Sequence, residues 1–270
     1  MNEDKAARLA AIRERNAAKR ADEAPAAGTG TRTTIYQPAP APNDTFTDLP
    51  PAMALHTLLL VLLASAAGAL AAAVVLPSWL PHLSESLLGP EPKAYWYLAR
   101  ASAFVAYGLL WLSMILGLTM TNKLARVWPG GPVAFDLHQH ASLLGLAFAL
   151  FHALVLLGDR YIGYTLPQLL MPFASTAYKP LEVGLGQIAV YLLALVGLSF
   201  YVRGLIGRKL WRSIHFLSFA LFFLALLHGI GSGTDSAAPF ATIFYWATGG
   251  TVLFATVYRV LVAAPSPARA

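Results

Sequence analysis

Cysteine is absent from this chain of 270 residues, and charge is scarce. Without cysteine the chain can build no disulfide, no thiol redox pair and no cysteine-ligated iron–sulfur cluster, so any redox chemistry must use another bound cofactor. Only 12% of the residues are charged and 57% are hydrophobic, which is far from the composition of a soluble protein. These scarcities indicate a polytopic membrane protein.

Six long apolar runs make up most of the chain after residue 50. Each is long enough to cross a hydrocarbon core of about 30 Å, and backbone groups in lipid must satisfy each other, so we expect helices. The short alternating apolar and polar runs of an outer-membrane barrel are missing. The sequence therefore predicts an all-α polytopic membrane protein, a six-transmembrane-helix bundle, with spans near residues 53–76, 96–120, 136–158, 184–203, 211–231 and 240–262. Asp136 is predicted to cap the third helix.

The basic residues predict the orientation. With the amino terminus inside, fifteen Lys and Arg residues fall on the cytoplasmic side and four outside, at Lys93, Arg100, Arg160 and Lys179. This asymmetry satisfies the positive-inside rule and predicts a cell membrane location with both termini cytoplasmic. The same rule accounts for the basic pI near 9.6, so we expect no nucleic-acid partner.

Composition also predicts three parts of the chain. Residues 1–50 combine a basic, helix-prone stretch with a Pro- and Ala-rich linker, and we expect a flexible cytoplasmic arm. Residues 51–262 hold the six helices, and residues 263–270 form a short cytoplasmic tail. Among the outer connections, Asp159 to Lys179 is predicted to lie over the outer end of the bundle.

Four histidines lie inside two of the predicted spans. His138 and His152 are fourteen residues apart, and His215 and His228 are thirteen apart. At about 1.5 Å per residue these intervals rise about 21 and about 19.5 Å, so the two helices would set the imidazoles in two facing pairs, one near each membrane face. Imidazole is a neutral ligand of haem iron, and a buried polar side chain in lipid needs a partner. The pattern predicts two stacked b-type haems.

The two histidine-bearing spans differ in the angle between their two histidines. Fourteen residues return to within about 40° of the starting face, and Gly145 lies on that face, where a small residue lets a porphyrin approach. Thirteen residues leave an offset of about 140°, so His215 and His228 cannot share one face of a straight helix. We expect a kink, a local bulge or a relative turn of the haems to absorb this offset.

These residues carry a family resemblance. The stretch from Asp136 to His152 and the stretch from Trp211 to Gly229, on the third and fifth of six helices, resemble the ferric reductase-like transmembrane domain. Tyr97-Leu98-Ala99-Arg100-Ala101-Ser102 on the second helix also resembles this family, which includes ferric reductases, NADPH oxidases and the haem-binding membrane subunit of the periplasmic methionine sulfoxide reductase system. The resemblance covers roughly residues 55–262.

The resemblance implies a cofactor set and a function. In the family the four histidine positions ligate two haems, which implies His138 with His215 on the inner haem and His152 with His228 on the outer haem. The expected function is di-haem b electron transfer from a cytoplasmic-side donor, a flavoprotein or quinol, to ferric iron, an extracytoplasmic reductase or oxygen outside. We expect an oxidoreductase component without its own flavin and NADPH domain, so a quinone, or a flavin supplied by a partner, would deliver the electrons.

Haem propionates need cationic partners, and the basic residues near the span ends supply candidates. Arg100 is predicted for the outer haem because it lies just inside a helix start, where an unpaired charge is unfavourable. Arg212 is predicted for the inner haem, because its stem can extend along the interface to an anion. No catalytic acid or base is expected, since the haem supplies the electron chemistry.

Other interpretations of the same residues stay open. Each intramembrane histidine can also be a hydrogen bonder to a neighbouring carbonyl, and His140 can replace His138 as a ligand. At the level of function, the chain can be an integral subunit of a larger respiratory or photosynthetic complex that acts as a haem relay or scaffold. A quinol-oxidising cytochrome b relative and a haem-free transporter or scaffold are the remaining alternatives.

Overall fold

The computed structural model describes residues 50–88, 93–176 and 178–263. The predicted amino-terminal arm and nearly all of the predicted tail lie outside these residues. Within the described residues the chain is all α-helical, and six helical spans are long and apolar enough to cross a membrane. The predicted all-α six-helix bundle is therefore confirmed, with spans Leu55–Trp79, Lys93–Thr121, Gly131–Gly158, Pro180–Ser199, Arg203–Ser232 and Pro239–Val262.

Three spans are single helices and three are composite. The single ones are α5 (Lys93–Thr121), α8 (Pro180–Ser199) and α12 (Pro239–Ala263). The first span joins α2 (Leu55–Leu70), a π-helical turn at Ala71–Val75 and α3 (Leu76–Trp79), and α4 (Pro81–Leu88) follows it. The third span is α6 (Gly131–Val155) with a 3₁₀ turn at Leu156–Gly158. The fifth joins α9 (Arg203–Ile206), α10 (Arg208–Phe216) and α11 (Ser218–Ser232).

The start of α6 corrects one prediction. Asp136 does not cap this helix, which begins five residues earlier at Gly131 and has Pro132 in its first turn. Proline suits the first helical positions, because its missing N–H would have no intrahelical partner there and its φ is already helical. Gly130, with a positive φ of 102°, makes the turn into the helix.

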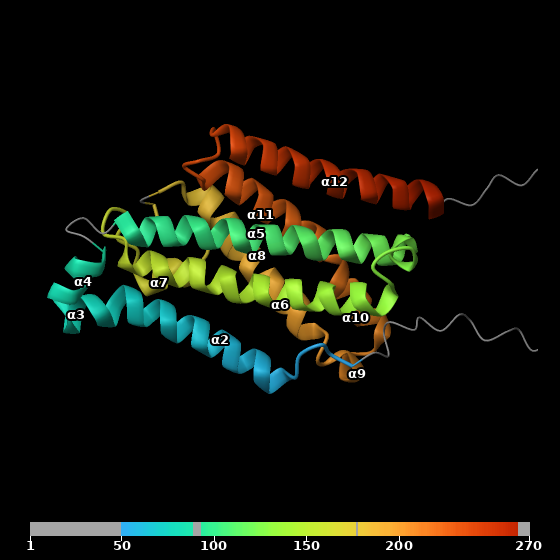
Figure 1. The fold of residues 1–270 in the computed structure, drawn as a ribbon, viewed down its shortest axis with the longest axis horizontal. Coiled ribbons are helices and arrows are strands. Elements are labelled where there is room, and N and C mark those ends of the chain that lie inside the picture. The colour runs from blue at the N-terminus through green and yellow to red at the C-terminus, as the bar shows by residue number, and fades with distance from the viewer. Residues whose placement is uncertain (1–49, 89–92, 177, 264–270) are drawn as a thin grey trace, which may run out of the picture. The chain divides into compact units, whose positions relative to one another are not determined.

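Two helix pairs build the bundle. α5 packs along α6, and α8 packs along α11, while α2 covers α6 and α12 covers α5. In Figure 1 the ribbons of α5 and α6 run side by side between α2 and α12. The main core lies between the pairs at mid-depth and consists of Tyr107, Leu110, Met114, Leu118, Leu146, Ala149, Ala189, Leu193, Leu221, Phe222 and Val252. The arrangement leaves the histidine-bearing helices of the two pairs facing each other.

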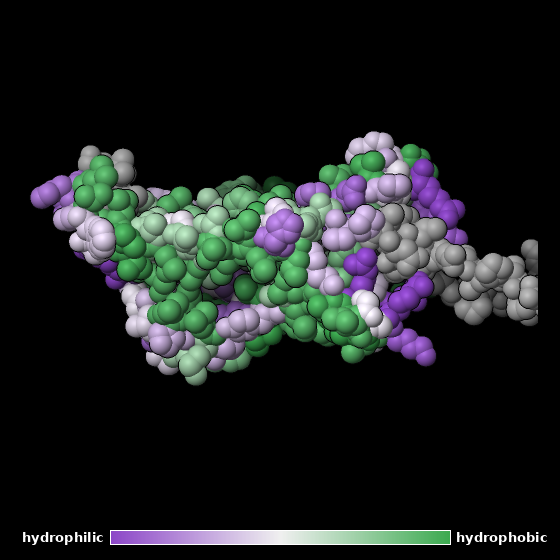
Figure 2. Space-filling view, turned by 90° about the horizontal axis from the view of Figure 1, so that it is seen from below, coloured by the Kyte–Doolittle hydropathy of each residue, from purple (hydrophilic) through white to green (hydrophobic). Residues whose placement is uncertain are grey.

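The outer surface of the helices suits lipid. Leucine, valine and aromatic side chains on α2 and α12 are largely exposed, among them Leu63 at 65% and Trp246 at 78%. Figure 2 shows apolar residues over the middle of one face of the helical unit and hydrophilic residues gathered towards its ends. In water such a surface would be strongly unfavourable, so the helical unit is that of a multi-pass membrane protein.

Candidate haem site

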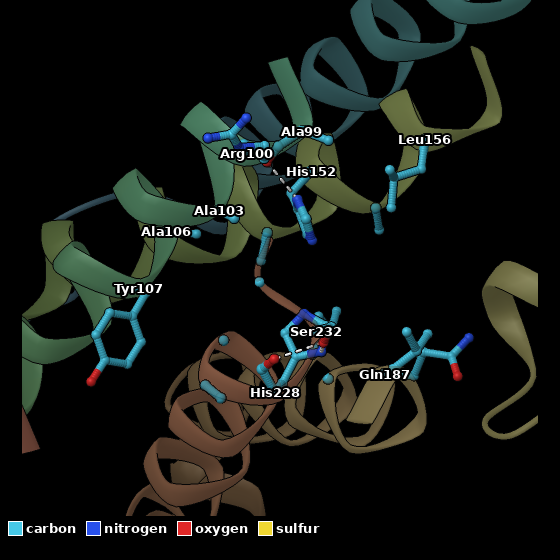
Figure 3. Close-up of a pocket in the computed structure, with 18 of the residues that line it drawn as sticks. Ala99, Arg100, Ala103, Ala106, Tyr107, His152, Leu156, Gln187, His228 and Ser232 are labelled. Atoms are coloured by element: carbon cyan, nitrogen blue, oxygen red, sulfur yellow. Dashed lines mark hydrogen bonds between the residues drawn. The ribbon is translucent and has the colours of Figure 1, made fainter. Parts of the chain in front are cut away.

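A cavity of about 690 Å³ lies between the two helix pairs. It runs from the outer connections, at Arg160 and Asp235, down to Leu110 and Leu221 in the core, and its walls are mostly apolar. Its volume lies within the about 300–1,000 Å³ typical of ligand pockets. His152 and His228 are both in the lining, and their rings point towards each other across the gap in Figure 3. The predicted outer histidines therefore share one cavity.

The outer pair comes from opposite walls of this cavity. His152 lies on α6 and His228 on α11, and their ring centroids are 6.2 Å apart with 70° between the ring planes. The Nδ1 of His152 is 2.7 Å from the carbonyl oxygen of Ala99 on α5, and the Nδ1 of His228 is 2.9 Å from that of Glu182 on α8. A carbonyl only accepts, so both Nδ1 atoms carry the proton and donate. Both Nε2 atoms are thereby left with a free lone pair.

The inner pair repeats this geometry. His138 on α6 and His215 on α10 have ring centroids 6.0 Å apart and ring planes 68° apart. The Nδ1 of His138 donates to the carbonyl oxygen of Ser113, 2.8 Å away. The Ser113 hydroxyl is also 3.0 Å from this Nδ1 and 2.6 Å from the hydroxyl of Ser142, which in turn donates to the backbone of His138. His138 is thus oriented by one closed hydrogen-bond network.

The fifth span is interrupted between its two histidines. α10 ends at Phe216, and α11 begins at Ser218. Leu217 between them donates its backbone N–H to Ile214 rather than continuing a regular turn. The fifth span is therefore not one regular helix between its two histidines. His215 meets His138, and His228 meets His152.

The spacing of both pairs fits two imidazoles on opposite sides of one metal ion. A bond from imidazole nitrogen to metal is about 2.0 Å long, and adding the half-width of each ring puts the two centroids about 6 Å apart. The observed centroid distances are 6.0 and 6.2 Å. Histidine ligands of metals almost always donate their other ring N–H to a carbonyl, carboxylate or water, as three of these four do.

The described residues do not supply enough ligands for a metal site made of protein side chains alone. Among residues 50–88, 93–176 and 178–263, no group of three or more His, Asp or Glu side chains could hold a metal ion. A structural zinc site needs four such ligands and a catalytic one three. Haem iron is already bound by four porphyrin nitrogens, so the protein needs to supply at most two ligands. Paired histidines are suited to the second case.

One glycine gives the site room, and it is not the one that the sequence indicated. Gly145, predicted to let a porphyrin approach, is in the cavity lining, but a Cβ there would make ordinary contacts with α5, at 3.5 Å from Leu109 and 3.6 Å from the Ala106 oxygen. Gly186 on α8 was missed, and a Cβ there would lie closer than 3 Å to three ring atoms of His228. Glycine inside an apolar helix is a signal for such close approach. Gly186 therefore makes the space in which His228 stands.

The predicted cationic residues occupy different positions. Arg100 lines the outer cavity, but it forms an ion pair with Asp235 in the α11–α12 connection, and its guanidinium carbon lies 4.2 Å from the centre of the Trp96 ring. Asp235 was not predicted from the sequence, although an acidic residue in the α11–α12 connection is a natural partner for Arg100. Arg212 lies exposed on α10 and is not in the lining of this cavity.

His140 behaves as a local hydrogen bonder. It is exposed on α6, and its Nδ1 is 2.9 Å from the carbonyl oxygen of Asp136, four residues earlier. The ring that faces His215 belongs to His138 instead. The structure therefore favours His138 over His140 for the inner pair.

The connection between α6 and α8 closes over the end of the cavity near His152 and His228, the pair that the sequence predicts on the outer side. Tyr161, Tyr164 and Gln168 from this connection are in the cavity lining. Gln187 on α8 holds α7 (Leu166–Leu170), because its Nε2 donates to the carbonyl oxygens of Gln168 and Leu169, 2.8 and 2.7 Å away. Burial raises the pKa of the Tyr164 phenol, so this phenol stays neutral.

Comparison of the chain with protein-family models, with curated proteins and with solved structures returned no match. Function is therefore inferred from the geometry of the site and from the resemblance carried by the histidine stretches.

Proposed function

We propose that this chain is a di-haem b transmembrane electron-transfer protein of the ferric reductase-like kind. The observation that carries the proposal is the pair of matched histidine pairs, with centroid distances of 6.0 and 6.2 Å and nearly equal interplanar angles. Two unrelated polar contacts would have no reason to share one geometry. His138 and His215 would hold the inner haem, and His152 and His228 the outer haem.

The residues of the chain have distinct tasks in this proposal. The carbonyl oxygens of Ala99 and Glu182 fix the Nδ1–H tautomer, so each outer imidazole offers its Nε2 to the iron. Apolar walls exclude water, and a propionate would meet Arg100, which pairs with Asp235, together with Lys93 and Arg160 in the lining. When bound, a haem supplies one-electron redox chemistry, and the protein supplies position and insulation.

The direction of transfer follows from the predicted topology. Lys and Arg residues are concentrated near the end that carries His138 and His215, which favours the cytoplasmic side for that end and cytoplasmic termini in the cell membrane. A cytoplasmic flavoprotein or quinol would then reduce the inner haem. The acceptor outside would be ferric iron, an extracytoplasmic reductase or oxygen, reached through the cavity at the outer end.

A reduced-minus-oxidised absorption spectrum tests the proposal. The protein is purified in detergent from haem-supplied cells, reduced with dithionite, and its haem is counted per chain by the pyridine method. We expect two b-type haems per chain, and one or none in His152→Ala and His215→Ala.

His140→Ala is the matched control, because it removes an imidazole from the same helix as His138 and His152 but outside both pairs. It should keep both haems. Folded, haem-supplied protein without a haem spectrum would refute the proposal and leave a transporter or scaffold as the better hypothesis.

A further inference from the structure

The turn between α5 and α6 exposes large apolar side chains although its backbone is well structured. It comprises residues 122–130, between the second and third membrane spans. Leu124, Val127 and Trp128 are 47%, 89% and 81% exposed. In Figure 1 the turn lies at the end of the bundle that also carries α10. Nothing in the described part of the chain covers these three side chains.

The exposure follows from how the turn is built. A 3₁₀ turn at Leu124–Arg126 follows α5, and the residue that it buries is Ala125. Ala125 is 2% exposed and packs with Leu116 and Ala134. Its carbonyl oxygen accepts the N–H of Gly130, 2.9 Å away. Because the small residue is the inward one, the larger apolar residues around it are left outside the bundle.

Two cations lie among these apolar side chains. Lys123 and Arg126 are both exposed, and within the described residues neither forms an ion pair with an acidic side chain. Residues 122–130 contain no Asp or Glu, and Asp136 is the one acidic residue from Lys93 to Gly158. The turn therefore combines two positive charges with an exposed apolar surface.

The surface of a membrane matches this combination. Because the turn joins two spans over residues 122–130, it lies close to the boundary between hydrocarbon and water. Tryptophan is enriched at that boundary, and the anionic phospholipids of the cytoplasmic leaflet attract neighbouring Lys and Arg side chains. The positive-inside rule predicts the cytoplasmic side for this end. A free phosphate ion would engage only the two cations, whereas a phospholipid engages the cations and the apolar side chains together.

We propose that the turn at residues 122–130 is a binding site for the headgroup of an anionic phospholipid. Lys123 and Arg126 bind the phosphate, and Val127 and Trp128 contact the glycerol and the first acyl carbons. The site does not depend on a bound haem. Each cation near an anionic membrane surface contributes about fivefold to affinity, so the two together contribute about 25-fold.

A lipid titration of the purified protein tests the site. The protein in a neutral detergent receives dioleoylphosphatidylglycerol, or dioleoylphosphatidylcholine as the reference lipid with the same acyl chains and no net charge, and bound lipid is counted by native mass spectrometry. We expect the wild type to prefer the anionic lipid. Lys123→Gln with Arg126→Gln should weaken binding of the anionic lipid at least about tenfold and leave the reference lipid unchanged.

Three control variants separate this site from the general excess of positive charge at the same end. Lys209→Gln with Arg259→Gln removes two charges outside the turn and should change lipid binding little. Lys123→Arg with Arg126→Lys keeps both charges and should keep the preference. Trp128→Ser keeps the charges but removes the apolar contact, so it should weaken binding of both lipids. Thermal unfolding in detergent without added lipid checks that each variant is folded.

Three results would overturn the inference. They are equal binding of the two lipids by the wild type, unchanged binding in Lys123→Gln with Arg126→Gln, and an equal loss in Lys209→Gln with Arg259→Gln. A wild type without lipid preference would leave an acidic protein as the partner of this surface. Displacement of the lipid by an equal concentration of inorganic phosphate would also refute the lipid site and assign the two cations to a free anion.

Discussion

Gly186→Ala is the sharpest single perturbation of the outer site. The added Cβ would lie closer than 3 Å to three ring atoms of His228, at distances that real Cβ atoms essentially never show. Either the imidazole or α8 must move. Since α8 also presents the Glu182 carbonyl to this ring, both movements disturb the hydrogen bond that fixes the tautomer of His228.

Two effects determine how much affinity for the outer haem Gly186→Ala should lose. Inserting a methyl group into a packed site typically costs about 1–3 kcal/mol. Loss of the outer hydrogen bond of a metal ligand weakens metal affinity by about 10–100-fold, which corresponds to about 1.4–2.8 kcal/mol. We therefore expect the outer haem to bind at least about tenfold more weakly, and the inner haem, whose ligands lie elsewhere on α6 and α10, to stay.

The assay is a haem count per chain at decreasing free haem, with the inner haem as an internal check that the protein has folded. Gly68→Ala in α2 is the matched control, because a Cβ there meets nothing within 4 Å. Gly117→Ala gives an intermediate case, since its Cβ would lie 3.4 Å from the His138 ring. If Gly186→Ala kept both haems with wild-type affinity, the assignment of His228 as a ligand standing over Gly186 would be wrong.

Three further changes test the scaffold around the site. Tyr107→Phe removes a phenol that is hydrogen-bonded to the Thr248 hydroxyl, 2.8 Å away, so the free energy of unfolding in detergent should fall by about 1 kcal/mol with both haems retained; no change would contradict a formed bond. Gln187→Leu deletes the amide that holds α7, and hydrogen exchange of the α7 backbone should quicken severalfold, an effect that leucine would not cause if α7 were held by packing alone. Asp235→Asn removes the anionic partner of Arg100, but the two side chains are 28% and 22% exposed, so stability should fall by about 1 kcal/mol or less; a larger fall would show that the pair is insulated from solvent.

The sequence was sufficient for the spans because lipid imposes a simple rule. A helix that crosses the hydrocarbon core needs about twenty mostly apolar residues, and this pattern is visible in the sequence. All six spans were predicted on this basis. The boundary at Asp136 was wrong because a polar residue near an expected start looks like a cap, while the actual start depended on the Gly130 turn and Pro132.

The site was harder to predict because several of its contacts are not encoded by residue type. The histidine depths followed from helical rise, and helical rotation showed that His215 and His228 cannot share one face of a straight helix. The break at Leu217 itself carries no glycine or proline signal. Asp235 approaches Arg100 only through tertiary structure, and side chains in connections have no fixed period from which to infer them. Ser232 is different, because it lies one turn after His228 on α11 and its contact follows from the i, i+4 spacing.

The main-chain anchors have a consequence for how this site tolerates change. His152 and His228 take their orientation from the carbonyl oxygens of residues 99 and 182, and almost any amino acid presents the same oxygen. A scan of side-chain replacements would therefore miss the part of these two oxygens, and at Ala99, which is 2% exposed, it would report core packing instead. Replacing the amide bond that carries each oxygen by an ester weakens the acceptor, leaves the side chain unchanged, and would reveal that part. In this protein the orientation of two imidazoles depends on the path of the backbone and not on the side chains of residues 99 and 182.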